Sequence, residues 1–418
     1  MTFRLGSLKQ HWFMGLVVLW MAVAVVFLLV APKPTGEQRA VSTEQPGALE
    51  STQPVASESS RPTTLAEDET LTARVVEVLE EGIVDLDIAG PHPYQRLLLR
   101  IERGSLAGQE VVVEHGTFTT ITEERLLHPG DRVYLERVGG PQGDRLYISD
   151  YVRTRPLFWI LALFMGLVVL VGRGKGLRSL VGTLFSLLVI FAFVVPHILA
   201  GRDPVSVSIA GSIVMLTVST YLVYGWNPKA HAAVAGMMLS LVLTGVLAWL
   251  LVGWTRLTGM GTEESMYLMM ELGPGVQLRG VVLAGIIIGS LGVLDDICVG
   301  QASAVFELIK VNRDLDWMEL FHHSLNIGRD HIAATVNTLL LAYVGASLPL
   351  MLAFTIYQEP FLQRINREPI AEEIVRTLVG SIGLVLAVPI TGLIAGLLAR
   401  WMVRREMASQ TQAPLFRR

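Results

Sequence analysis

Two adjacent carboxylates, Asp295 and Asp296, interrupt a run from Val281 to Phe306 that is otherwise almost entirely apolar or small. A carboxylate at the centre of a bilayer costs roughly 2.5 to 3.5 kcal/mol on insertion scales, whereas each Leu, Ile or Val contributes only about 0.3 to 0.6 kcal/mol. If this run is a membrane helix, the acidic pair therefore needs a partner or a proton.

Helical geometry places the two acids on different faces of this run. Steps of three or four residues from Asp296 trace a stripe of small side chains, namely Gly285, Gly289, Gly292, Asp296, Gly300 and Ser303. Asp295 lies about 100° round the helix, among larger apolar residues. We therefore expect a second helix to pack on the stripe, and we rank Asp296 above Asp295 as the working residue.

Composition places the chain among integral membrane proteins. Its 418 residues are 51% hydrophobic and only 17% charged, and the mean hydropathy is +0.51. A net charge of −4 without a long basic run excludes a nucleic-acid partner. The single cysteine, Cys298, excludes an intrachain disulfide.

Hydropathy predicts about eight membrane-spanning helices. They lie near 12–31, 156–172, 178–199, 204–224, 231–253, 279–306, 332–357 and 374–402. The basic residues beside the spans favour one side of the membrane, with both termini cytoplasmic: Arg4, Lys9, Arg173, Lys175, Arg178, Lys229, Arg400, Arg404 and Arg405. Since the first apolar run is long and Pro32 follows it, we expect an uncleaved signal anchor.

The region between the first two spans predicts an extracytoplasmic segment, 32–153, in two parts. Residues 32–68 are rich in Pro, Ser, Thr, Gln and Glu, which is typical of a flexible linker. Residues 69–153 alternate short apolar runs with turns such as His128-Pro129-Gly130-Asp131. This pattern predicts a small all-β domain, an OB-type barrel or a sandwich, which length and turn spacing do not separate.

The expected fold is thus an all-α polytopic membrane bundle with a small all-β extracytoplasmic domain. Its expected parts are a signal-anchor helix (1–31), the linker (32–68), the β domain (69–153), a seven-helix membrane domain (154–405) and a cytoplasmic tail (406–418).

Polar residues in the seventh span supply partners for the acidic pair. Asn337 can donate to an ionised carboxylate or accept from a protonated one, which makes it the best partner for Asp296. Gln301, Ser303 and Thr338 complete the candidate ion or substrate site. Alternatively, the acid and the amides act as glue between helices and transport nothing.

Arg329 and Asp330 are candidates for a gate that closes the cytoplasmic end of the site by pairing across it. The segment from Glu307 to His331 contains His and acidic residues, but its Trp317, Leu320 and Phe321 pattern favours an amphipathic helix at the cytoplasmic interface over a metal site.

Two further spans carry packing signals. Pro389 beside Gly392 in the eighth span is a helix breaker next to small residues, as in the broken helices of transporters. In the fifth span, Gly236, Ser240 and Thr244 recur every four residues, which favours a packing seam over a binding site.

Several short motifs resemble the YibE/F-like family of membrane proteins over about 156–402. They are Gly292-Val293-Leu294-Asp295-Asp296, Gln301-Ala302-Ser303-Ala304, Gly328-Arg329-Asp330-His331-Ile332, Asn337-Thr338, Leu348-Pro349 and Gly174-Lys175-Gly176-Leu177. The resemblance implies a polytopic protein of the bacterial inner membrane with an N-terminal anchor and an extracytoplasmic region. It implies no particular biochemical activity.

We therefore expect a transporter or ion-coupled permease that uses a buried carboxylate of the sixth span. Its expected partners are the lipid bilayer, a proton or cation, and a small-molecule substrate. The alternative is a noncatalytic scaffold that recruits an envelope protein through the β domain. Enzyme activity, metals and cofactors are not expected, because no other span carries a central carboxylate for an aspartyl protease and no phosphate-binding glycine loop occurs.

Overall fold

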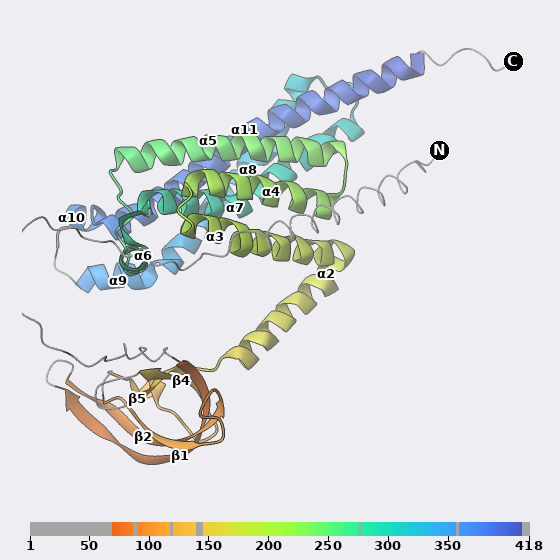
Figure 1. Ribbon diagram of the computed structural model, residues 1–418. Helices are drawn as coiled ribbons and strands as arrows, with labels where there is room; N and C mark the ends of the chain where they lie inside the picture. Colours follow the sequence, from red (N-terminus) through yellow and green to blue (C-terminus); the bar gives the residue numbers. More distant parts are fainter. Residues whose placement is uncertain are drawn as a thin grey trace, which may run out of the picture. The chain divides into compact units, whose positions relative to one another are not determined.

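A computed structural model describes residues 69–86, 90–117, 120–138, 145–275, 277–356 and 359–411 (Figure 1). The expected anchor (1–31), the linker (32–68) and the last seven residues of the expected tail (412–418) lie outside the described residues. The chain divides into two compact units, and their described parts are 69–166 and 167–411.

The first unit is an antiparallel sheet of five strands, in the order β3-β2-β1-β4-β5. The strands are β1 (Glu69–Leu86), β2 (Gly90–Arg103), β3 (Glu110–His115), β4 (Arg132–Val138) and β5 (Arg145–Tyr151). A short 3-10 helix, η1 (Glu123–Arg125), lies between β3 and β4. Contacts between β3 and β5, the two ends of this order, show that the sheet curls on itself.

Buried and exposed residues alternate along the strands, and the buried ones form the core of this unit. In β1, Leu71, Ala73 and Val75 are almost completely buried, because alternate residues of a strand point to the same face. Val75 pairs with Leu99 of β2, and Ala73 pairs with Val133 of β4. The prediction of a small all-β domain is confirmed, while the OB-type assignment stays a prediction.

The second unit is helical, and α2 leads into it. Its helices are α2 (Thr154–Val189), α3 (Val195–Leu199), α4 (Pro204–Tyr224), α5 (Pro228–Trp254), α6 (Glu263–Leu272), α7 (Leu278–Val311), α8 (Trp317–Ala346), α9 (Leu348–Ile356), α10 (Phe361–Ile365) and α11 (Glu368–Thr411). A π-helical turn, η2 (Ile190–Val194), joins α2 to α3, and a 3-10 turn, η3 (Gly273–Gly275), follows α6.

Five helical segments of the described chain are long and apolar enough to cross a membrane, and α8 with α9 forms a sixth if the bent pair is one span. One of the five, Thr154–Leu199, contains Arg173 at φ 51° and ψ −134°, which is not helical. The two predicted spans 156–172 and 178–199 lie on either side of this residue. A polytopic membrane protein is confirmed, and the total of eight spans stays a prediction.

Side-chain caps set the beginnings of the bundle helices. Asp203 accepts a hydrogen bond from the Ser206 amide at 2.9 Å, and Asn227 accepts one from the Ala230 amide at 2.9 Å. A proline follows each cap, as is common where the first helical amide has no intrahelical partner. At α8, Asp316 and Glu319 form a capping box.

Three helices, α5, α7 and α11, pack against one another, and α4 packs on α7 and α8 on α11. A side chain in place of Gly236 of α5 would collide with Thr391 of α11, and one in place of Gly383 of α11 would collide with Thr244 of α5. Small residues thus bring these backbones close together. The predicted packing seam of the fifth span is confirmed.

One expectation about helix boundaries is wrong. The segment expected at the interface is helical and forms the first turns of α8, because the Asp316 capping box starts the helix at Trp317 and Leu320 and Ser324 bury one face of it. Its place at the interface stays a prediction. The expected break at Pro389 is absent, since α11 continues through it. The bend occurs instead at Ser347, between α8 and α9, where the chain turns by 57°.

Candidate functional site

Asp295 lies near the middle of α7, a helix of 34 residues, and its side chain points towards α4. The hydroxyl Oγ1 of Thr220 donates a long hydrogen bond, 3.4 Å, to Asp295 Oδ1. Thr220 is completely buried, and its hydroxyl also lies 3.7 Å from the sulfur of Met237 on α5. Asp295 itself is half-buried. The carboxylate therefore sits at the inner edge of the bundle with one weak donor.

A second group of polar side chains lies one turn further along α7. The buried thiol of Cys298 lies beside the hydroxyls of Ser240 on α5 and Thr391 on α11, and it also senses the charge of Asp295. Ser240 Oγ and Thr391 Oγ1 are buried, and in the described part of the chain they have no hydrogen-bond partner other than the Cys298 thiol beside them. Unpaired buried hydroxyls are costly and are commonly satisfied by water or a ligand.

These five residues, Thr220, Ser240, Asp295, Cys298 and Thr391, form what we call the polar cluster. They come from four helices, α4, α5, α7 and α11. A carboxylate beside spare hydroxyl groups has the chemistry to hold a proton or to offer oxygen atoms to a small cation. In the described ranges, no group of three or more His, Cys, Asp or Glu side chains is placed to hold a metal ion.

The inward position predicted for Asp296 is wrong, because Asp295 and not Asp296 faces the interior of the bundle. Asp296 is exposed, and a side chain built at Gly285, Gly292 or Gly300 would meet nothing within 4 Å. Only Gly289 on this stripe has a neighbour, the Tyr343 hydroxyl, at 3.3 Å from its would-be Cβ. The expected helix packing on the stripe is therefore wrong for the described residues, because the larger residues on the other side of α7 fill the bundle interior instead.

The remaining candidates on α8 are not brought to the acids. Asn337 is exposed, and no hydrogen bond joins it to Asp296 in the described part of the chain. Thr338 is also exposed and donates to the carbonyl of Ala334 in its own helix at 3.0 Å. Asn337 as the partner of Asp296 is therefore wrong in this arrangement.

The expected gate is likewise not formed. Arg329 donates to Asn326 Oδ1 at 3.0 Å instead of pairing with Asp330, and both Arg329 and Asp330 are exposed. Residues that are adjacent on one helix point about 100° apart, so a direct ion pair between them is unfavourable.

Gln301 and its neighbours hold helices together. Its Nε2 donates to the Ser324 carbonyl of α8 at 2.8 Å, and both residues are buried. At Gly392 of α11, a Cβ would lie 2.9 Å from Ser324 Oγ and 3.2 Å from Gln301 Nε2. Gln301 thus joins α7 to α8 where Gly392 lets α11 approach. Ser303 contributes no such link, because its hydroxyl donates to the Val299 carbonyl of its own helix at 2.7 Å.

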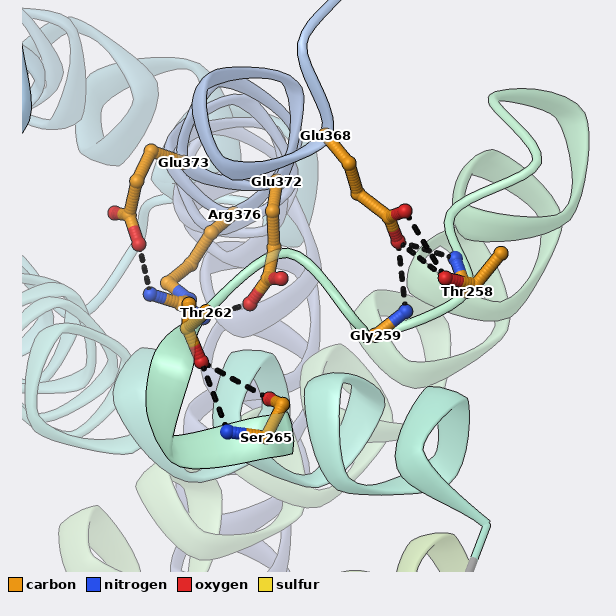
Figure 2. A network of polar contacts seen from close by, with 8 residues as sticks. All are labelled: Thr258, Gly259, Thr262, Ser265, Glu368, Glu372, Glu373 and Arg376. Atoms are coloured by element: carbon orange, nitrogen blue, oxygen red, sulfur yellow. Dashed lines mark hydrogen bonds and ion pairs between the residues drawn. The ribbon is translucent and has the colours of Figure 1, made fainter. Parts of the chain in front are cut away.

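Sequence reasoning missed Thr220, Ser240, Cys298 and Thr391 as members of the site. Many hydroxyl and thiol side chains in apolar helices serve only in helix packing, so none of these residues could be recognised from the sequence as part of a site. It also missed Glu372, Glu373 and Arg376 at the start of α11 (Figure 2), because the eighth span was expected to begin at 374. Three charged residues within one helical turn at a span boundary were the available signal.

Comparison with known proteins gives one match. The family model described as YibE/F-like protein matches residues 160–401, which is more than half of the chain. This range includes α4, α5, α7, α8 and most of α11, and hence all of the polar cluster. No curated protein and no solved structure matches the chain.

Proposed function

As the chain belongs to the YibE/F-like family, we propose that this multi-pass membrane protein is an ion-coupled transporter in which Asp295 binds the coupling proton or cation. The observation that carries the proposal is the half-buried carboxylate at mid-helix in α7, which accepts a hydrogen bond from a hydroxyl of α4 and lies one turn from the hydroxyls of α5 and α11 around Cys298. Carboxylates inside membrane spans face a bundle interior or a water-filled cavity and mark ion pathways.

The polar cluster supports transport over a purely structural role. Helix glue requires satisfied hydrogen bonds, as Gln301 makes with Ser324. Among the described residues, Asp295 accepts one long bond from Thr220, and the Ser240 and Thr391 hydroxyls have only the weak partner that the Cys298 thiol offers. Free bonding capacity next to a carboxylate suits a group that takes up and releases an ion.

The proposed setting is the bacterial cytoplasmic membrane, with both termini in the cytoplasm and residues 32–153 outside it. The basic residues at the ends of the spans support this orientation: Arg173, Lys175, Arg178, Lys229, Arg400, Arg404 and Arg405. The transported substrate is proposed to be a small molecule, with no covalent step and no cofactor.

A scaffold role is the second candidate, and one observation favours it. Among the described strands, the far end of β1 pairs only with β2, and it exposes the apolar residues Leu79 and Ile83, the latter at 78%. Apolar side chains at an open hairpin suit contact with an envelope protein. Deletion of 33–153 separates the two functions, because a scaffold loses its phenotype whereas the membrane bundle keeps its ion-dependent currents.

Asp295→Asn tests the transport proposal, with Asp296→Asn as the matched control one residue away. Purified protein in proteoliposomes on a solid-supported membrane is given a jump in proton or sodium concentration, and the transient charge displacement is recorded. We expect the wild type and Asp296→Asn to give a current and Asp295→Asn to lose at least about tenfold of it, since the amide cannot titrate.

Thermal melting in detergent shows whether each variant is folded. If Asp295→Asn does not fold, Thr220→Val takes its place, because it removes the donor to Asp295 while keeping the shape of the side chain. An unchanged current in a folded variant at position 295, or an equal loss in Asp296→Asn, would refute the proposed role of Asp295.

A further inference from the structure

A second carboxyl group, Glu372, is buried at the start of α11, far from the polar cluster. Its side chain is only 6% exposed. One oxygen, Oε1, accepts a hydrogen bond from Arg376 Nη2 at 2.5 Å, whereas the other, Oε2, is buried and has no partner among the residues that the structure describes (Figure 2). A buried carboxylate oxygen without a donor carries an uncompensated desolvation cost, which a bound proton removes.

Arg376 is shared between two glutamates. It pairs with Glu372 and also with Glu373, whose side chain is more exposed, at 23%. Two carboxylates around one guanidinium leave an excess negative charge, which favours uptake of one proton. If Glu372 takes that proton, Arg376 keeps Glu373 as its partner, so no buried cation is left unpaired.

The charges that face Glu372 come from α11 itself. They are Glu368, Glu373 and Arg376. The carboxylate of Glu368 has hydrogen-bond donors of its own. It accepts hydrogen bonds from the Thr258 amide at 2.6 Å and the Gly259 amide at 2.8 Å (Figure 2).

The elements packed beside this turn are mostly apolar. From α5, the following loop and α7 they present Ala248, Val252, Leu257, Val282, Leu283 and Ile286. Arg279 on α7 and Arg364 on α10 form no ion pair with Glu372 in the described part of the chain. On α8, Tyr343 interacts electrostatically with Arg376 and Glu373. The protonation of Glu372 is therefore set mainly by its own helical turn.

Buried hydroxyl groups lie between Glu372 and the polar cluster. Because Cys298 lies beside Thr391, Glu372 and Asp295 are separated by roughly 24 Å along the bundle, at 1.5 Å of rise per residue. Between them α11 buries the hydroxyl group of Thr377 and α5 buries that of Thr244, within an otherwise apolar contact.

We propose that Glu372 is a second proton-binding carboxyl group, through which protons enter the bundle from the end that holds the loop between α5 and α6. This inference rests on the proposed transport function, which it deepens by naming the proton as the coupling ion. Protonation releases Glu372 from Arg376, while Glu373 retains the guanidinium.

Carbodiimide labelling tests proton binding without relying on activity. Dicyclohexylcarbodiimide reacts with protonated carboxyl groups in apolar surroundings, and peptide mass spectrometry of the labelled full chain locates the adduct. We expect labelling at Glu372 that falls about tenfold for each unit of rising pH above the midpoint. Glu373, bound to the same arginine, is the internal control, and we expect it to be labelled about tenfold less because water reaches it. Absence of the adduct at Glu372, or equal labelling of both glutamates, overturns the inference.

Charge-displacement currents separate this inference from the proposed function. Glu372→Gln mimics the protonated side chain, so we expect its proton-jump current to lose its pH dependence while Glu373→Gln keeps it. If Asp295→Asn keeps its current but Glu372 is labelled, the proposed function fails and proton binding at Glu372 stands. If Asp295→Asn loses its current and Glu372 stays unlabelled, only the inference fails.

Discussion

At position 236 of α5 there is no room for a methyl group. A Cβ there would lie 2.9 Å from the Cβ of Thr391 and 3.0 Å from its Cγ2, and it would come even closer to Oγ1. At Gly285 of α7, by contrast, a Cβ would meet nothing within 4 Å. Both glycines lie inside helices, so replacement by alanine changes helix propensity equally. The two positions therefore isolate the effect of close packing.

We expect Gly236→Ala to destabilise the bundle by about 1 to 3 kcal/mol through overpacking, and Gly285→Ala to leave its melting temperature unchanged or higher. Thermal melting of the purified variants in detergent measures the difference. A comparable loss of stability in Gly285→Ala would mean that another helix does cover the stripe of small residues on α7.

At the scale of the element, one carboxylate joins three strands of the β unit. Glu102 of β2 accepts from Arg74 of β1 at 2.8 Å and pairs with Arg132 of β4 at 2.8 Å. The hydrogen bond from Arg74, followed by that from Arg132, lowers the pKa of Glu102 below its ordinary value of 4.5. Because the folded pKa is the lower one, the stabilisation is complete above about pH 4.5 and is lost as pH falls through the folded value.

We therefore expect the strands around Glu102 to open more readily as the pH falls below about 4.5. We expect Glu102→Gln to make this opening less dependent on pH. Hydrogen-exchange protection factors of β1 and β4 in the full chain, corrected for intrinsic rates, report the opening. Glu124→Gln, at an exposed position in η1, serves as the control. An unaltered pH profile in Glu102→Gln would show that these ion pairs do not contribute.

At the scale of the whole molecule, the single cysteine makes the membrane orientation testable. Cys298 is completely buried and should not react with a bulky maleimide. Glu124→Cys and Asp314→Cys place one exposed thiol in the β unit and one in the loop between α7 and α8. From the basic residues at the span ends, we expect an impermeant maleimide to label position 124 in intact cells and position 314 only after permeabilisation. The opposite pattern would invert the proposed topology.

Much of the architecture could be predicted from local patterns. Apolar runs of membrane length, the linker composition and the alternating strands predicted a membrane bundle with a small β domain. The four-residue spacing of Gly236, Ser240 and Thr244 predicted a seam, and the structure places it against α11. Helix limits were less predictable, since the cap at Asp316 and the bend at Ser347 depend on one or two side chains.

Packing alone decided which of the two carboxylates of α7 faces the interior of the bundle. Sequence alone indicated that α7 carries an acidic pair in an apolar helix and that the chain resembles its family. It did not indicate which acid faces inward, because in lipid an apolar side chain is as stable outside the bundle as inside it, so periodicity says little about orientation. The contacts of α7 with α4, α5 and α11 turned Asp295 towards Thr220 and left Asp296 exposed.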